Sequence, residues 1–437
     1  MIYGLIRMVV GIALRLFYRV QVRERQVLPD GPLLFIGNHP NGLIDPALLF
    51  VVTPRKLTFL AKAPLFKLPV LGWLIRGMGA LPVYRRQDDP SRMAGNDVTL
   101  DTAARALIRG GAITIFPEGK SHSAPQLAAL KTGAARIALK AREAGADVTV
   151  VPVGLTYARK HRFRSEVHVE VGVPLRVSEL VPDPRDPDAV RALTDAMFQG
   201  LREVTLNLES WEDLPLVETA EELWALRHAD HPGDVERLRR FAQGVTHFRS
   251  ERPEEFEALR TWLLDFRERL RLTRVEAQDL STHYRARTVV RFCLRMLLSL
   301  VLGLPLLIVG FVVYAIPFFL VRGIVRALRP EDDVEATYKL LGALVIFPLW
   351  TLGTCLMLGW RLGPGWAALA LVSLPLLAVF ARHEIEAWHS RVRDIRLFLR
   401  LGSLTAVRAG LLREGEELAE AVDLEATRYL EQAADGG

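Results

Sequence analysis

Long stretches without charged residues in the C-terminal half constrain this chain more than any other feature. Met296 to Val321 contains 26 residues and no charge, which is enough for one tilted helix across a bilayer. Leu340 to Trp360 and Pro364 to Ala381 are two further apolar stretches, separated only by residues 361–363. The sequence therefore predicts an integral membrane protein, with a transmembrane region of two to three spans at 289–382.

The charges beside these stretches give conflicting signals about topology. Arginines flank both ends of the first stretch, so the excess of basic residues on cytoplasmic loops gives no preference there. The basic stretch from Arg382 to Arg400, within a predicted C-terminal helical tail at 383–437, favours a cytoplasmic C-terminus and hence an even number of crossings. The three apolar stretches give an odd number, so both counts stay open.

The basic composition fits a membrane surface better than nucleic acid. The formal net charge is +6 and the pI is about 9.4, but Lys and Arg flank apolar segments instead of forming one basic stripe. We therefore predict anionic membrane lipid, and not nucleic acid, as a partner. Cys293 and Cys355 have no CxxC pattern or histidine companion, so neither a disulfide framework nor a zinc site is predicted.

The first 26 residues are predicted to form an N-terminal interfacial membrane helix. Arg7, Arg15 and Arg19 interrupt an apolar stretch at roughly helical spacing, so we expect these arginines to face lipid head groups. The alternative is a helix buried in the protein core. No small-residue cleavage site precedes the first polar stretch, so a cleaved signal peptide is not expected.

Residues 27–180 have the pattern of an α/β domain. Short β-branched runs alternate with stretches of helical apolar spacing at 98–109 and 126–144, which predicts a mixed, partly parallel sheet flanked by helices. Loops at the carboxyl ends of parallel strands are then expected to form the active site. The candidate strands are Leu33 to Ile36, Leu57 to Ala61, Leu81 to Tyr84, Ala112 to Phe116, Val148 to Gly154 and Val167 to Val171.

A Pro/Asp-rich segment, VPDPRDPD at 181–188, marks the end of the α/β pattern. A charged helical region is predicted from 181 to 288, because long amphipathic stretches with many charges follow the segment. It carries no repeat and no recognisable motif, and we interpret it as a helical packing or spacer domain.

A histidine and an aspartate follow the first predicted strand, in the segment NHPNGLIDP at 38–46. Turn residues around His39 should expose it at the strand end. The Asp45 carboxylate can accept a proton from one imidazole nitrogen and leave the other nitrogen as a general base. This is the His–Asp half of a catalytic triad, with the substrate hydroxyl as the nucleophile. Taken alone, the pair is equally compatible with a turn that carries a solvated histidine.

Three later segments supply the other elements of a phosphate-recognising site. GALPVYR at 79–85 ends on Arg85, whose planar fork suits a phosphate monoester, although a surface arginine after an edge strand is the alternative. FPEGKS at 116–121 presents Glu118, Gly119 and Lys120 directly after a buried strand, where glycine lets backbone N–H groups approach an anion. VVPVGL at 150–155 predicts a buried strand that forms the floor of the site.

These four segments, in this order and approximate spacing, resemble the glycerophospholipid acyltransferases, the family of lysophosphatidate and glycerol-3-phosphate acyltransferases. The resemblance covers residues 27–180. It implies His39 as the base, Asp45 as its orienting acid, Arg85 and the Glu118–Gly119 turn as phosphate-site elements, and an acyl thioester as the donor. Asn41 and Lys120 are the remaining candidates for substrate binding. Neither a metal nor a cofactor is expected, since acyl-CoA or acyl carrier protein enters as a substrate.

One departure from the family pattern concerns the acceptor. The family places four residues between His and Asp, whereas five residues, 40–44, separate His39 from Asp45. This longer spacing resembles the subgroup that acylates glycerol 3-phosphate or dihydroxyacetone phosphate, and Pro40 and Gly42 could accommodate the added residue in an irregular turn.

The sequence predicts a membrane-bound O-acyltransferase of phospholipid synthesis, with 1-acyl-sn-glycerol-3-phosphate as the favoured acceptor and phosphatidic acid as the product. The alternatives are sn-1 acylation of glycerol 3-phosphate or dihydroxyacetone phosphate, a thioester or lipid hydrolase, and a lipid-binding protein without catalysis. A serine lipase is disfavoured because the chain has no GxSxG segment. The expected location is the bacterial inner membrane, with the catalytic domain on the cytoplasmic face.

Overall fold

A computed structural model describes the chain at residues 2–24, 27–67, 69–84, 95–228, 230, 234–273, 275–280, 286–332, 334–403 and 405–435. The chain divides into two compact units. The first contains Met1–Asn207 together with Arg329–Leu340, and the second contains Leu208–Leu328 and Leu341–Gly437.

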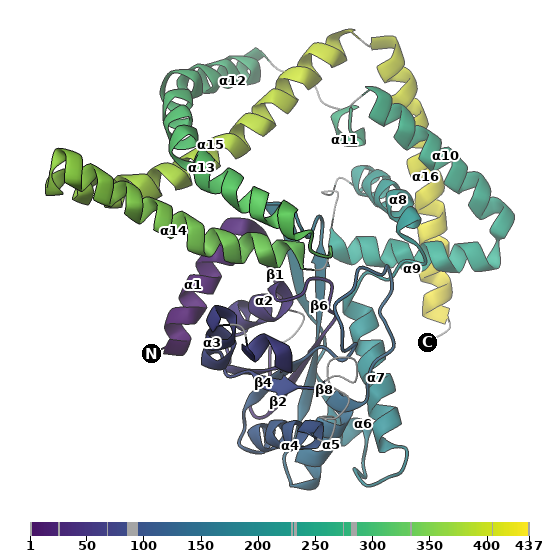
Figure 1. Cartoon of the computed structure of the whole chain (residues 1–437). Coiled ribbons are helices and arrows are strands. Elements are labelled where there is room, and N and C mark those ends of the chain that lie inside the picture. Colours follow the sequence, from purple (N-terminus) through teal and green to yellow (C-terminus); the bar gives the residue numbers. More distant parts are fainter. Residues whose placement is uncertain are drawn as a thin grey trace. The chain divides into compact units, whose positions relative to one another are not determined.

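An eight-stranded sheet forms the centre of the first unit (Figure 1). Its order is β1-β7-β6-β2-β5-β3-β4, and β8 pairs with β6. All pairs are parallel except those of β6 with β7 and β8, which confirms the predicted mixed, partly parallel sheet. The strands are β1 (Tyr18–Glu24), β2 (Leu33–Gly37), β3 (Leu57–Lys62), β4 (Leu81–Val83), β5 (Ala112–Ile115), β6 (Thr149–Tyr157), β7 (Ser165–Val171) and β8 (Leu175–Arg176).

Helices cover both faces of this sheet because successive side chains of a strand point to opposite faces. In β2, Leu34 and Ile36 pack with the helices on one face, while Leu33 and Phe35 pack on the other. The first face is covered by α4 (Gly95–Ile108), α5 (Gly133–Glu143) and α7 (Ala189–Val204). The second is covered by α1 (Ile2–Phe17), α2 (Ile44–Val52) and α3 (Pro69–Gly77), which follows the short helix η1 (Ala63–Lys67).

All six predicted strands are present, with ends that differ by a few residues. Two strands were not predicted. β1 lies in the segment that was expected to be helical to residue 26, and it pairs in parallel with β7 from Tyr18 to Glu24. The predicted helix at 126–144 begins only at Gly133, because residues 127–131 form an extended loop that reaches the candidate site.

The orientation expected for the N-terminal helix is wrong for Arg7. Its guanidinium donates hydrogen bonds to the carbonyl oxygens of Val51 (3.1 Å) and Thr53 (2.7 Å) instead of pointing to lipid. One face of α1 packs into the core through buried side chains such as Leu14, while Leu5 and Ile12 are exposed. The outward face of α1 is therefore mostly apolar, and of the two arginines of this helix only Arg15 is exposed there.

The first unit extends beyond the segment that was predicted to end it. After α6 (Val177–Leu180), the helix α7 packs closely on β6. A Cβ at Gly154 would lie 1.7 Å from the carbonyl oxygen of Val204, so only glycine permits this approach. Residues from the start of α14 (Glu335–Leu362) also join this unit, since Ala336 is buried among Leu14, Phe17 and Ile44.

Helices make up the second unit (Figure 1). α8, α9, α10 and α16 pack around an apolar cluster that includes Phe256, Leu263, Phe266 and Leu418. The helical elements of the unit, besides most of α14, are η3 (Trp211–Asp213), α8 (Leu214–Arg227), α9 (Val235–Glu251), α10 (Pro253–Thr273), α11 (Ala277–Leu280), α12 (Ala286–Leu298), the π-helical turn η4 (Ser299–Gly303), α13 (Leu304–Leu328), α15 (Pro364–Ser403) and α16 (Thr405–Asp435).

Three helical segments of the described chain are long and apolar enough to cross a membrane: Val290–Leu328, Glu335–Leu362 and Pro364–Trp388. They contain the three apolar stretches predicted from sequence. Most side chains in these segments do not pack inside the unit, which is the pattern expected of helices that face lipid.

Candidate active site

Three loops at one edge of the sheet form the candidate site. β2, β5 and β6 are neighbouring parallel strands, so their carboxyl ends meet at the same edge. The loop after β2 carries His39, the loop after β5 carries Glu118, and β6 ends at Tyr157. These residues lie at the carboxyl ends of their strands, where the sequence predicted the loops of the active site.

His39 and Asp45 lie in direct contact. Nδ1 of His39 is 2.8 Å from Oδ2 of Asp45, and the His39 ring stacks on Phe116 at 4.3 Å between ring centroids. Asp45 is fully buried, whereas the His39 side chain remains 13% exposed. The five intervening residues form a turn in which Gly42 has φ +28°, and Asp45 sits in the first turn of α2. The irregular turn expected from sequence therefore brings the two side chains together.

Two further groups hold the Asp45 carboxylate. The backbone N–H of Asn41 donates to Oδ2 (2.7 Å), and the Tyr157 hydroxyl donates to Oδ1 (2.6 Å). Burial, followed by the nearby Asp45 charge, raises the pKa of Tyr157 well above its usual value. The Tyr157 hydroxyl consequently keeps its proton and remains a donor. With Oδ2 also facing the imidazole, the arrangement holds Asp45 where it can fix one tautomer of His39.

The Asn41 side chain lies in the protein interior beside the His39–Asp45 pair and does not reach the surface of the site. Its side chain is fully buried, and Nδ2 donates to the Tyr18 hydroxyl at 3.1 Å. Tyr18 in turn donates to the Lys160 carbonyl, and burial raises the pKa of Tyr18. Asn41 was expected to bind substrate, but these contacts assign its side chain to positioning the turn that carries His39.

Glu118 also contacts the loop of His39. Its Oε1 accepts a hydrogen bond from the backbone N–H of His39 (2.9 Å), and its Oε2 accepts one from the backbone N–H of Ala128 (2.8 Å) and contacts His122. The His122 backbone N–H donates to the His39 carbonyl at 3.1 Å. The buried Glu118 carboxylate thus joins three loop segments, a positioning role that differs from the substrate contact expected from sequence.

Gly119 leaves space that a lysine fills. It has φ +76°, and a Cβ there would lie 2.5 Å from Nζ of Lys131. The exposed Lys131 side chain therefore lies directly over the Glu118–Gly119 turn, and Lys120 is exposed beside it. A third lysine, Lys160, donates to the Pro40 carbonyl at 3.3 Å and contacts Ser123. Positive charge is thus available at this edge for an anionic substrate.

Residues 19–156 match the family model described as "Acyltransferase", a range that includes the His39–Asp45 pair and Glu118. The chain contains an acyltransferase-family domain. The match ends one residue before Tyr157, and it does not include the second unit.

Individual relatives resemble part of the chain. Glycerol-3-phosphate O-acyltransferase 1 of Saccharomyces cerevisiae is 36% identical over 155 residues, which are 33% of this chain and 20% of the relative. A chloroplastic 1-acyl-sn-glycerol-3-phosphate acyltransferase of Arabidopsis thaliana is 28% identical over 140 residues, 32% of this chain and 37% of the relative. The chain therefore spans well under half the length of these relatives.

A solved structure was also found, the 1-acyl-sn-glycerophosphate acyltransferase of Thermotoga maritima. It is 22% identical, with a TM-score of 0.35, and the match covers 46% of this chain and 78% of that chain.

Arg85, the remaining substrate-binding candidate of the acyltransferase domain, lies outside the described residues. Its role in binding phosphate stays a prediction. In the part of the chain that the structure describes, no group of three or more His, Cys, Asp or Glu side chains could hold a metal ion.

Sequence reasoning missed four side chains that surround the pair: Tyr18, His122, Lys131 and Tyr157. Tyr157 follows the VVPVGL segment by two residues, at the carboxyl end of its strand, and this position was a usable signal. His122 stands four residues after Glu118. Tyr18 and Lys131 gave no such signal, because they reach the site through an unpredicted strand and an extended loop.

Proposed function

We propose that this protein transfers an acyl group from a thioester to a hydroxyl of a glycerol-phosphate acceptor in phospholipid synthesis. One observation carries the proposal: the Nδ1 atom of His39 is held by a buried Asp45, while its Nε2 atom makes no hydrogen bond among the described residues. An imidazole oriented in this way can act as a general base. The acyltransferase-family match supports the reaction class.

In the proposed mechanism, His39 Nε2 removes the proton of the acceptor hydroxyl as its oxygen attacks the thioester carbonyl. Asp45 stabilises the imidazolium that forms. The tetrahedral intermediate then collapses, the C–S bond breaks, and the imidazolium returns its proton to the departing thiolate. The stacked Phe116 ring and the hydrogen bonds to the His39 backbone keep the base in place throughout.

We propose that the acceptor carries a phosphate group. Lys120 and Lys131 place positive charge at the Glu118–Gly119 turn, and Arg85 remains the candidate for bidentate contact with phosphate. Glycerol 3-phosphate is the first acceptor to test, because of the five-residue spacing between His39 and Asp45 and the name of the yeast relative. The plant relative is named for the acceptor 1-acyl-sn-glycerol-3-phosphate, the one favoured from sequence, and it is the alternative.

Attachment to a membrane through the three apolar segments belongs to the same proposal. It suits a reaction whose product stays in the bilayer. The two relatives compared by sequence come from a yeast and a plant, so they do not support the bacterial inner membrane expected from sequence.

The proposal is tested with the full chain in nanodiscs, a radiolabelled acyl thioester and a panel of acceptors. The panel contains glycerol 3-phosphate, 1-acyl-sn-glycerol-3-phosphate, dihydroxyacetone phosphate and a phosphate-free monoacylglycerol, and products are separated by mass. We expect acylation of at least one phosphorylated acceptor and a loss of about 10³-fold or more in His39→Ala. The matched control is His168→Ala, on β7. Unchanged transfer in His39→Ala would reject the assignment.

The hydrolase alternative is separated by the same assay. A transferase consumes the thioester faster when the acceptor is present and yields acylated acceptor. Hydrolysis would be favoured instead if free fatty acid is released at the same rate with and without an acceptor and if this release is lost in His39→Ala.

A further inference from the structure

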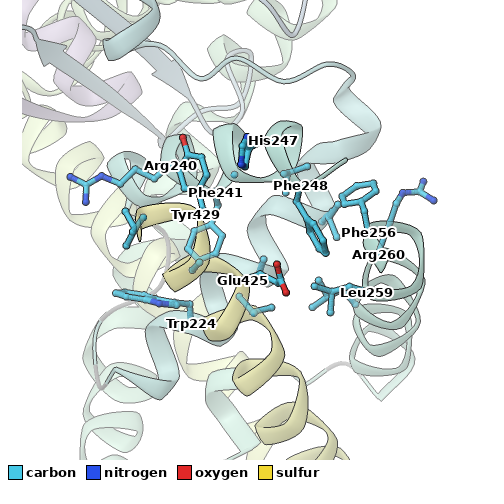
Figure 2. A pocket seen from close by; sticks show the side chains of 18 of the residues that line it. Trp224, Arg240, Phe241, His247, Phe248, Phe256, Leu259, Arg260, Glu425 and Tyr429 are labelled. Carbon is cyan, nitrogen blue, oxygen red and sulfur yellow. The ribbon is translucent and has the colours of Figure 1, made fainter. Parts of the chain in front are cut away.

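Four helices of the second unit line a half-open cavity that the acyl-transfer reaction does not explain. Its volume is about 150 Å³, and it is bounded by α8, α9, α10 and α16. Five aromatic rings line it, together with aliphatic side chains: Trp224, Phe241, Phe248, Phe256 and Tyr429. Figure 2 shows Trp224 at one end, Phe248 and Phe256 at the other, and Tyr429 from α16 between them.

The cavity exists because small residues stand where large ones could. Gly244 of α9 lines it, and a Cβ there would meet only the Tyr429 ring, at 3.8 Å. Ala426 of α16 lines it as well. Protein interiors are normally packed to the density of organic crystals, so an apolar space of this size is unusual. An engineered apolar cavity of about 150 Å³ in another protein binds benzene, which sets the capacity at about six carbon atoms.

Cationic side chains stand at the edge of the cavity. Four arginines line it, namely Arg237, Arg240, Arg252 and Arg260, against one carboxylate, Glu425. The Arg252 guanidinium lies 4.6 Å from the centre of the Phe248 ring, so charge and apolar wall adjoin. Figure 2 shows Arg240 and Arg260 extended at the outer edge.

Arg240 and Arg260 are available to an anion at little cost. Arg240 pairs with Glu236 (2.6 Å) and Arg260 with Glu257 (3.3 Å), both within their own helix. Neither glutamate lines the cavity. Exposed pairs of this kind are weak, and an arginine fork binds a phosphate or carboxylate through two parallel hydrogen bonds. The edge therefore suits a negative head group and the interior an uncharged chain.

We propose that this cavity binds the terminal part of a single alkyl chain, whose anionic head group contacts the arginines at its edge. The ligand class is a single-chain amphiphile with a phosphate or carboxylate head. About six carbons enter the cavity, and longer chains leave the remainder at the opening. The proposal does not rest on the acyl-transfer reaction.

The test uses the full chain in nanodiscs and octyl phosphate with a diazirine at the chain end. After photolysis, labelled peptides are located by mass spectrometry. We expect label on residues of α9, α10 or α16 that line the cavity, and competition by unlabelled octyl phosphate. Label confined to the apolar segments between 290 and 388 would mean partition into the bilayer and would overturn the proposal.

A filled cavity provides the decisive comparison. Gly244→Leu places a side chain against Tyr429, and we expect labelling of the cavity peptides to fall at least tenfold. Gly410→Leu, on α16, is the matched control, since a Cβ at Gly410 meets nothing within 4 Å. If Gly244→Leu does not fold, as judged by thermal unfolding, Ala426→Leu tests the same point from the opposite wall. Equal labelling in a folded filled variant and the wild type contradicts the site.

Chain length and head group are tested separately by competition. Alkyl phosphates from two to ten carbons should gain about fourfold in affinity per methylene up to about six carbons, and less beyond. Arg240→Gln combined with Arg260→Gln should weaken octyl phosphate and octanoate about fivefold or more and leave octanol unchanged. Arg191→Gln, which removes a comparable exposed pair with Asp195 on α7, is the control. If the double variant weakens the binding of octanol and of octyl phosphate equally, the arginines do not contact the head group, and this part of the proposal is contradicted.

Discussion

At the scale of single residues, the chemistry of the site depends on how firmly the loop of His39 is held. The imidazole is fixed at Nδ1 by Asp45, on its face by Phe116, and at the backbone by Glu118. None of these contacts uses Nε2. The sequence marks His39, Asp45 and Glu118 as candidates, but the contacts that Phe116 and Glu118 make with His39 from the segment after β5 are seen only in the fold.

Glu118→Gln tests whether that carboxylate positions the base or binds substrate. Glutamine keeps the shape, but its amide can accept only through one atom, so either the His39 N–H or the Ala128 N–H loses its acceptor. We expect kcat to fall about 10- to 100-fold while KM for the acceptor changes less than threefold. A rise in KM with unchanged kcat would return Glu118 to substrate binding. Steady-state kinetics with varied acceptor give the answer.

Tyr157→Phe tests the second oxygen of Asp45. Without the hydroxyl, Oδ1 loses its donor inside the protein, and the carboxylate attracts the imidazole proton more strongly. We expect kcat to fall about 3- to 30-fold and the acid limb of the pH–rate profile to move to higher pH. A merely structural role would lower kcat without moving that limb. Tyr3→Phe, which removes the hydrogen bond from the Leu57 N–H to another tyrosine hydroxyl, controls for loss of a hydroxyl.

The buried tyrosines also predict a loss of stability in alkali. Burial raises the pKa of Tyr18 and of Tyr157 above the ordinary value of 10.0, so the folded state holds these protons after the unfolded chain has released them. The contribution of these two hydroxyls to the free energy of unfolding is complete below pH 10 and is lost as the pH rises above 10. Tyr18→Phe should therefore make Tm fall less steeply between about pH 10 and 11.5, because unfolding of the variant releases up to one proton fewer. An unchanged slope in thermal unfolding of the variant would contradict the shift.

At the scale of elements, one glycine lets a helix lie unusually close to the sheet. Gly154 on β6 lets the end of α7 approach until backbone nearly touches backbone. This contact continues the sheet packing past residue 180, where the sequence pattern of alternating strands and helices ends. It also supports β6, whose carboxyl end carries Tyr157.

Gly154→Ala should therefore be far more damaging than its size suggests. The added Cβ would overlap the Val204 carbonyl oxygen, so α7 or β6 must move, and we expect a loss of about 2–4 kcal/mol, seen as a lower Tm. Gly133→Ala, at the start of α5, is the control because its Cβ meets nothing within 4 Å. Equal Tm values for the two variants would show that α7 yields without cost.

At the scale of the whole molecule, sequence and structure agree where periodicity is strong. The central strands could be predicted because β-branched runs alternate with helical spacing, and the pair His39–Asp45 because turn residues follow the first of them. β1 could not, since Tyr18–Glu24 is mostly polar and exposed on one side and follows a helix without a break. The direction of Arg7 also escaped prediction, because its acceptors are backbone carbonyls that carry no sequence signal.

The two cysteines offer a test of the membrane segments in the intact chain. Cys293 is exposed near the start of the first segment, among arginines, whereas Cys355 is buried within the second and packs with Ala370 and Leu374. A thiol inside a bilayer or a packed helix pair ionises poorly and is reached slowly by a charged reagent. We expect a water-soluble maleimide to modify Cys293 in open membrane sheets and Cys355 only after detergent denaturation.

Single-cysteine variants make the readout unambiguous. Cys355→Ser leaves Cys293 as the sole target, and Cys293→Ser leaves Cys355, with mass spectrometry of the intact chain counting modified thiols. Rapid modification of Cys355 in native membranes would place the middle of Glu335–Leu362 in water. That result would reduce the number of membrane crossings from three to two. The basic segment after Ala381 would then lie on the same side of the membrane as the segment before Met296.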